Sequence, residues 1–137
     1  MTLVEAKSHS DEFCKAFNAR NLSSVLAFYS PSLAGHGGGG QFGIDDLRKW
    51  FPATWASFPD VRIGHEVIAA AGDSYTARWS LSGTHNGMYV GKAPTGKHFE
   101  AWGLFVHRMQ DGKIMEVWTA FDDLGLREQL GLIPKLG

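Results

Sequence analysis

The sequence predicts a single α+β domain in which helices come first and strands follow. Apolar residues recur about every 3.6 residues before Pro59 and about every two residues after it. Gly72–Asp73 and Asp111–Gly112 then separate long alternating stretches, as turns in an antiparallel meander do. This order is typical of a curved sheet wrapped on helices. With 137 residues, we expect one domain over positions 1–137.

Local signals set the expected boundaries. Asp45 and Asp46 suit the first turn of a helix, and Pro52 should kink or split that helix. The glycine run in 35–40 is expected to form a flexible loop. The expected helices cover 4–19, 22–29, 44–57 and 124–130, and the expected strands cover 61–70, 74–85, 98–109 and 113–121.

Composition excludes several classes of protein. The net charge is −1 and no basic cluster is present, which argues against nucleic acid as a partner. No signal peptide or long apolar run is visible, so no membrane association is expected. The single cysteine, Cys14, cannot form an internal disulfide, and this favours a cytoplasmic location.

An acidic pair, Asp122 and Asp123, stands where the last apolar strand gives way to a helix. A carboxylate beside a buried strand is costly unless it is paired, hydrogen-bonded or used. We therefore expect Asp122 to be a catalytic base and Asp123 to cap the helix over 124–130. The alternative is that Asp122 itself is the cap.

Pairing across the last hairpin sets the expected surroundings of Asp122. Centred on Asp111–Gly112, it places these residues opposite each other: Ala101 and Asp122, Gly103 and Ala120, Phe105 and Trp118, His107 and Glu116. One face should therefore carry Asp122, Trp118, Phe105, Glu116 and His107. Small residues around Asp122 would leave room for a ligand.

Two of the six histidines are candidates to assist this carboxylate. His36, in the glycine-rich loop, could donate to a substrate oxygen, or it could be a surface residue. His107 could take the same role, or it could only pair with Glu116 across the strands. The histidines lack HxH or HxxxH spacing and cysteine partners, so no metal site is expected.

Aromatic residues are abundant, with five tryptophans in one small domain. Most aromatic residues at such spacings belong to a core, but these could also line a pocket for a flat apolar ligand. The expected substrate-binding residues are Trp118, Phe105, Trp55, Trp79, Phe51 and Gly103.

An ordered set of short motifs covers nearly the whole chain. They are His36, FPD at Phe58–Asp60, GD at Gly72–Asp73, GTH at Gly83–His85, GxxPTG at Gly91–Gly96, DGKI at Asp111–Ile114, ExWxxxD at Glu116–Asp122 and LGLxxQLG at Leu124–Gly131. This set resembles the SnoaL-like polyketide cyclase family of the nuclear transport factor 2-like superfamily.

The resemblance implies a cone: three N-terminal helices packed on a strongly curved, mixed, mostly antiparallel sheet around a pocket. It implies a homodimer and a small hydrophobic or aromatic carbonyl substrate. Because the strand over 61–70 looks apolar on both faces, we expect the outer face of the sheet to form the dimer. The implied reaction is a cofactor-free intramolecular aldol ring closure. The family's acid/base aspartate falls on Asp122 and its histidine on His36, while Val117 replaces a histidine found in many relatives. Alternatives are an isomerase or hydroxylase acting on a related polycyclic substrate, or a non-catalytic ligand-binding protein.

Overall fold

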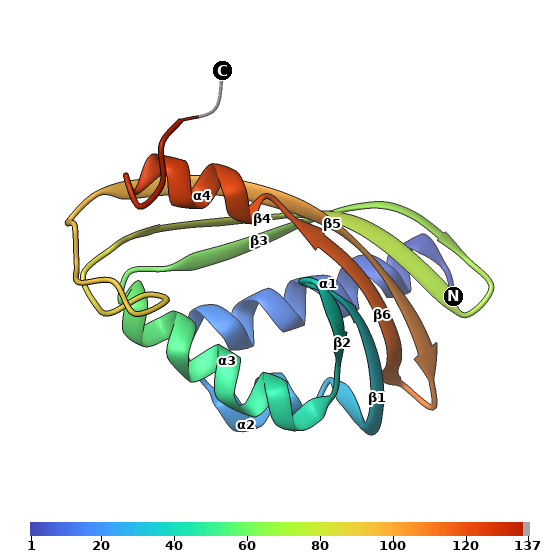
Figure 1. Cartoon of the computed structure of the whole chain (residues 1–137). Helices are drawn as coiled ribbons and strands as arrows, with labels where there is room; N and C mark the ends of the chain where they lie inside the picture. The colour runs from blue at the N-terminus through green and yellow to red at the C-terminus, as the bar shows by residue number, and fades with distance from the viewer. Residues whose placement is uncertain (136–137) are drawn as a thin grey trace.

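The computed structural model describes residues 1–135, and in that part of the chain four helices pack with one six-stranded sheet (Figure 1). The helices are α1 (Leu3–Asn18), α2 (Leu22–Leu26), α3 (Ile44–Ser57) and α4 (Asp123–Gln129). The strands are β1 (Tyr29–Gly37), β2 (Gly40–Phe42), β3 (Arg62–Ala71), β4 (Ser74–Thr84), β5 (His98–Gln110) and β6 (Lys113–Phe121).

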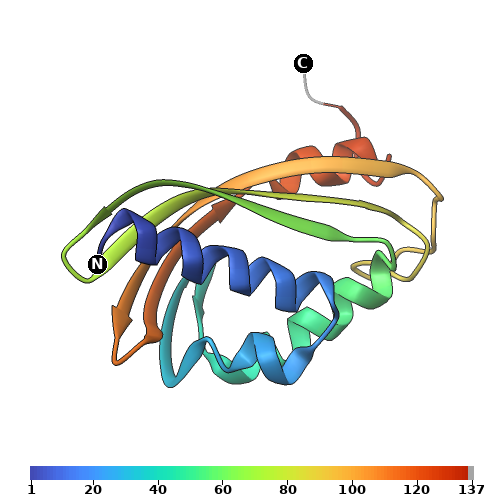
Figure 2. The same ribbon diagram turned by 180° about the vertical axis from the view of Figure 1, so that it is seen from behind.

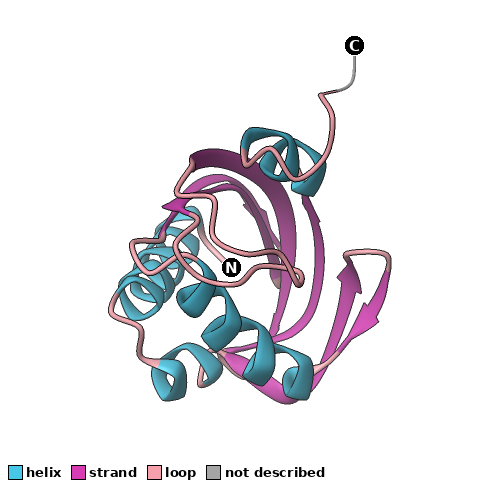
Figure 3. Ribbon diagram, turned by 60° about the vertical axis from the view of Figure 1, so that its left-hand side comes forward, coloured by secondary structure: helices cyan, strands magenta, loops and turns pink. Residues whose placement is uncertain are grey.

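The sheet is strongly curved, and its concave side holds the first three helices. Its strand order is β2-β1-β6-β5-β4-β3, and β1 runs parallel to β6 while the other pairs are antiparallel. Helix α4 follows β6 and lies beside the end of β5, where the Gln129 side chain exchanges hydrogen bonds with the backbone of Glu100 (Figures 1 and 2). Viewed toward one end, the strands curl around the helices (Figure 3). The expected cone-shaped, mixed α+β fold is confirmed.

The helices begin at local capping signals and bury one face. Thr2 and Glu5 form a reciprocal capping box at the start of α1, and Phe13 and Phe17 on that helix are buried. In α3, the Asp46 carboxylate accepts a hydrogen bond of 2.8 Å from the backbone N–H of Gly43. Of the two expected effects of Pro52, a kink or a split, the split does not occur, because α3 continues through this residue.

The segment after α2 differs from the expectation. The second helix ends at Leu26, and residues 35–40 belong to the β1–β2 hairpin, so the expected flexible loop was wrong. A Cβ on Gly37 would overlap the Thr119 backbone oxygen, because β1 lies tightly against β6. Gly37 therefore permits the close pairing of β1 with β6.

A bulge in the last hairpin decides which side chains face the helices. The turn at Asp111–Gly112 forms as expected, but Arg108 pairs with Glu116 while Met109 pairs with Ile114. Met115 is therefore an extra residue in β6, and the predicted pairing was wrong by one position. The observed partners are Gly103 and Phe121, Leu104 and Ala120, Phe105 and Thr119, Val106 and Trp118, and His107 and Val117. A one-residue slip moves side chains to the opposite face.

Within residues 1–135, no helix has both the length and the apolar character that a bilayer span requires.

Candidate functional site

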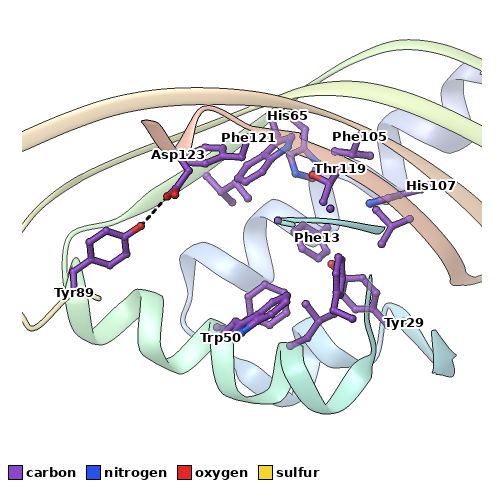
Figure 4. A pocket seen from close by; sticks show the side chains of 18 of the residues that line it. Phe13, Tyr29, Trp50, His65, Tyr89, Phe105, His107, Thr119, Phe121 and Asp123 are labelled. Atoms are coloured by element: carbon purple, nitrogen blue, oxygen red, sulfur yellow. Dashed lines mark hydrogen bonds between the residues drawn. The ribbon is translucent and has the colours of Figure 1, made fainter. Parts of the chain in front are cut away.

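A pocket of about 720 Å³ opens between the helices and the concave side of the sheet. This volume is in the range of small-molecule sites. The side chains that surround it come from α1, α3, α4, the sheet and the loop between β4 and β5 (Figure 4). The lining residues are Phe13, Tyr29, Gly37, Gly38, Phe42, Leu47, Trp50, Phe51, Ile63, His65, Trp79, Tyr89, Phe105, His107, Val117, Thr119, Phe121, Asp123 and Arg127.

Asp123 and Arg127 are the only carboxylate and guanidinium among the described residues that line the pocket. The Asp123 carboxylate accepts a hydrogen bond of 3.1 Å from the Tyr89 hydroxyl on one oxygen. Its other oxygen accepts one of 2.9 Å from Nε of Arg127, one helical turn later. Figure 4 shows Tyr89 and Asp123 facing each other at one end of the pocket. The Asp123 side chain is half exposed, so this end is the mouth.

Tyr89 belongs to a loop that is tied to the rest of the fold. The Ser57 hydroxyl donates to the Met88 carbonyl, and the Ser57 carbonyl accepts from the backbone N–H of Gly87. The Tyr89 ring packs on Phe58, with ring centroids 5.0 Å apart. Burial, and then the neighbouring Asp123 charge, raise the pKa of Tyr89 to about 12. The hydroxyl is therefore held in place and keeps its proton.

The base of the loop packs on a buried histidine, His85. Nδ1 of His85 accepts from the backbone N–H of Thr95 at 3.2 Å, and the ring is fully buried. This contact places the ring proton on Nε2, which has no hydrogen-bond partner among the described residues. His85 thus serves the loop and not the pocket.

A second polar group occupies the closed end of the pocket. The Tyr75 hydroxyl bridges Nδ1 of His107 at 3.1 Å and Nδ1 of His9 at 2.9 Å. The hydroxyl of Ser10 lies 2.6 Å from Nδ1 of His65. Burial lowers the pKa of His107 well below its ordinary value and that of His65 to about 4. Both histidines are therefore neutral hydrogen-bonding groups near neutral pH.

Aromatic rings form most of the wall between the two ends. Trp79 stacks on Phe121 with ring centroids 4.5 Å apart, and Phe105 stacks on His107 at 3.8 Å. Flat faces of this kind suit a planar, largely apolar ligand with polar atoms at its ends.

The structure places Asp122 outside the pocket. Its carboxylate accepts a 2.8 Å hydrogen bond from the backbone N–H of Gly125 and so caps α4, while Asp123 enters the pocket. The prediction that Asp122 lies in the pocket and that Asp123 caps the helix was wrong. The alternative, in which Asp122 is the cap, is confirmed. The bulge at Met115 turns Phe121 inward, and the following alternation puts Asp122 outside.

His36 and Trp118 also lie on the outer side. Nε2 of His36 lies 2.7 Å from a carboxylate oxygen of Glu116, and its ring stacks on Trp118 at 5.4 Å. Trp118 is 42% exposed. Neither residue lines the pocket, so the expected placement beside a substrate was wrong for both. Glu116 pairs with His36 and Arg108, and not with His107 as the alternative for His107 supposed.

Of the remaining residues that were predicted for the site, four line the pocket and two lie behind its wall. Phe105, Trp79, Phe51 and His107 line the pocket, and their functional roles stay predictions. Trp55 does not line it but packs between Phe17 and Phe51. Gly103 lies behind the wall, where a Cβ would come within 2.8 Å of Nε1 of Trp79. Gly103 therefore makes room for a lining residue without lining the pocket itself.

Four polar residues that line the pocket were not predicted as site residues: Asp123, Arg127, Tyr89 and His65. One signal was available: Asp123 and Arg127 are four residues apart in a helix, the spacing of a side-chain pair. Tyr89 gave none, because its loop has no periodic pattern.

The chain is similar to a known protein family and to several solved structures. Residues 9–130 match the family described as SnoaL-like polyketide cyclase. No curated protein matches the chain significantly. Among solved structures, the chain is similar to AclR of Streptomyces galilaeus, described as a candidate hydroxylase, with 26% identity and a TM-score of 0.89. That match covers 99% of this chain and 87% of AclR.

The chain is also similar to wild-type IdmH of Streptomyces antibioticus, described as a candidate polyketide cyclase. The identity is 27% and the TM-score 0.80, over 91% of this chain and 97% of IdmH. A third similar structure is TsrD of Streptomyces laurentii, with 21% identity and a TM-score of 0.84; the match covers 97% of this chain and 99% of TsrD. At this identity the likeness supports the fold alone. Because the family match spans most of its length, the chain belongs to the SnoaL-like polyketide cyclase family.

Proposed function

We propose that the protein is a cofactor-free cyclase that closes a ring in a polyketide-type carbonyl substrate by intramolecular aldol condensation. The observation that carries the proposal is the position of Asp123. Its carboxylate is oriented by two donors, Tyr89 and Arg127, at the mouth of an aromatic pocket. The family match and the likeness to IdmH also support a cyclase function.

The chemistry requires a base and a group that holds negative charge. Asp123 removes a proton from a carbon next to a carbonyl, and the resulting enolate carbon attacks a second carbonyl of the same molecule. The Arg127 guanidinium lines the pocket beside this carboxylate, so it can stabilise the enolate oxygen. The pocket holds the reacting carbons together, which favours closure over reaction with water.

The closed end binds the remainder of the substrate. His107 lies opposite Val117, and Asp123 follows six residues later, roughly 20 Å of extended chain. Figure 4 shows His107 and Tyr89 at opposite ends of the pocket. We therefore assign to His107, with His65, the binding of distal substrate oxygens, in place of the catalytic role that was expected for His107.

Two activities test this proposal with one probe, a naphthyl-substituted diketone whose carbonyls are separated by three carbons. Its enolisation is measured as deuterium uptake from heavy water by NMR, and its closure to a six-membered ring by chromatography. Asp123→Asn keeps the side-chain shape but cannot accept the proton. Both rates should fall by about 10²–10⁴-fold.

Asp122→Asn is the matched control, because asparagine caps a helix about as well as aspartate. That variant should retain both rates. If Asp123→Asn stayed folded and kept the parent rates, Asp123 would not be the base. A parent protein that binds the probe with no uptake or closure would favour the ligand-binding alternative.

The likeness to AclR supports one second candidate, hydroxylation of a similar polycyclic substrate. The two reactions differ in mass balance. Aldol closure leaves the substrate mass unchanged or lowers it by one water, whereas hydroxylation adds one oxygen atom. Mass spectrometry of the product therefore separates them.

We also propose that the protein is a cytoplasmic homodimer joined through the outer face of the sheet. Four large apolar side chains on β5 and β6 are exposed there: Trp102, Leu104, Val106 and Trp118. The guanidinium of Arg78 lies 5.2 Å from the ring of Trp102, which adds a cation–π contact at this face. A contiguous apolar face of this kind suits a second copy of the chain. The cytoplasmic location rests on Cys14 being the only cysteine.

A further inference from the structure

We propose that Tyr89 is the general acid of the ring closure: its hydroxyl protonates the new alkoxide and then recovers a proton from Asp123. This inference rests on the proposed aldol function and adds a residue that was not expected from the sequence. It concerns the second half of the reaction, in which the attacked carbonyl oxygen must be neutralised.

Geometry places the hydroxyl where such an acid is needed. Tyr89 lines the pocket, and its oxygen is 3.1 Å from the Asp123 carboxylate. A substrate carbon within reach of that carboxylate therefore has its neighbouring atoms within reach of the phenol. A direct hydrogen bond also lets a proton pass from Asp123 to Tyr89 without a bridging water.

The loop backbone holds the phenol in this position. A Cβ on Gly87 would overlap the Ala56 carbonyl oxygen, so the chain runs directly against the end of α3. The backbone groups of Tyr89 and Lys92 pair at 3.0 and 2.8 Å and close a tight turn immediately after the tyrosine. The hydroxyl is therefore preorganised, as transition-state groups must be.

The proton balance closes over one turnover. Asp123 takes the proton from the substrate carbon and becomes a neutral acid, and the enolate forms the new carbon–carbon bond. The attacked carbonyl becomes an alkoxide, which receives the Tyr89 proton. The phenolate then takes the proton from Asp123, because a phenolate is far more basic than a carboxylate. Both residues return to their starting states, and no external acid is required.

Other lining groups are poorer donors for this step. Arg127 does not release a proton in proteins. His107 and His65 are neutral, and His107 is at the other end of the pocket from Asp123. Tyr29 lines the pocket with His107 at that same far end (Figure 4). Tyr89 is the lining hydroxyl that contacts the proposed base.

The test is Tyr89→Phe, which keeps the ring against Phe58 and removes only the hydroxyl. The variant is assayed with the same naphthyl diketone for deuterium uptake and for ring closure. Enolisation needs the base alone, whereas closure needs the acid as well. Uptake should stay within about threefold of the parent protein while closure falls by about 10²-fold or more.

The possible results distinguish a failure of the Tyr89 proposal from a failure of the aldol function. Equal losses of uptake and closure in Tyr89→Phe would mean that Tyr89 only positions Asp123, and parent-like closure would remove it from the chemistry altogether. Either outcome overturns the Tyr89 proposal and leaves the base intact. A parent protein with neither activity overturns the aldol function and the Tyr89 proposal together.

Discussion

The carboxylates of Asp122 and Asp123 are adjacent in the chain but belong to different parts of the molecule. Asp122 accepts from the backbone N–H of Gly125 at 2.8 Å and begins α4, whereas Asp123 accepts from Tyr89 at 3.1 Å at the mouth of the pocket. One carboxylate stabilises the helix, and that helix carries Arg127 to the other carboxylate. The cap thereby contributes to the site without touching a ligand.

Removing the cap should lower stability and leave the chemistry largely intact. Asp122→Ala deletes the acceptor for the Gly125 N–H, which should reduce the free energy of unfolding by about 1 kcal/mol. The free energy of unfolding of Asp122→Asn should lie within a few tenths of a kcal/mol of that of the parent protein. Urea denaturation monitored by tryptophan fluorescence measures both. Equal stability of the alanine and parent proteins would show that the cap contributes nothing.

Stability should fall in mildly acidic solution because of the buried histidines. The pKa of His65 is about 4 in the folded protein and near its ordinary value of 6.5 in the unfolded chain. Between these values the unfolded chain binds a proton that the folded protein does not, so the stability present above about pH 6.5 is lost as the pH falls toward 4. Over this pH range the His65 titration alone should lower the free energy of unfolding by about 3 kcal/mol, and the lowered pKa of His107 acts in the same direction.

Urea midpoints at about pH 7 and about pH 5 check this expectation. In His65→Gln, which cannot titrate, the difference between the two midpoints should be smaller than in the parent protein. The same difference in both proteins would place the acid sensitivity elsewhere.

A methyl group at Gly103 should disturb the pocket wall. A Cβ there would overlap the backbone oxygen of Ala120 and come within 2.8 Å of Nε1 of Trp79. Because a backbone oxygen in a paired strand cannot move aside easily, Gly103→Ala should cost about 1–3 kcal/mol. Gly40→Ala is the control, since a Cβ there meets nothing within 4 Å. Thermal unfolding of the two variants distinguishes crowding from a general intolerance of alanine at strand glycines.

Charge on the outer face should disrupt the proposed dimer. Leu104 is 45% exposed in the isolated chain, and Leu104→Glu would place a carboxylate in the middle of the apolar face. Sedimentation velocity at micromolar concentration should give a dimer for the parent protein and a 15.0 kDa monomer for the variant. A 15.0 kDa species for the unchanged parent would contradict the dimer.

The periodic parts of the fold were predictable from the sequence. Helices α1 and α3 and strands β3 to β6 fall within a few residues of their expected bounds, because each has a continuous hydrophobic pattern. Strands β1 and β2 were missed. Their segment is rich in glycine and lacks clear alternation, and β1 is held by pairing with β6, which is distant in the chain.

The site was harder to predict than the fold, for one physical reason. The distance of a residue from the turn at Asp111–Gly112 predicts which face of the sheet its side chain occupies only if the strand pairing is regular. The extra residue Met115 interrupts that pairing. Trp118 and Asp122 were therefore assigned to the pocket face, whereas Thr119 and Asp123 line the pocket in the structure. Nothing in the local sequence marks Met115 as a bulge, because its strand reads as unbroken.

The parallel pairing of β1 with β6 also has a consequence for how the protein is made. As the chain leaves the ribosome, the β1–β2 hairpin emerges early, but the strand beside which it lies comes almost last. Until β6 is complete, the hairpin has no neighbouring strand and Gly37 and Phe42 have no pocket to line. Pairing over so long a stretch of chain is slow to form. A nascent chain that stops before Lys113 would therefore leave β1 without the strand that it pairs with, and unpaired strand edges of this kind are prone to aggregate.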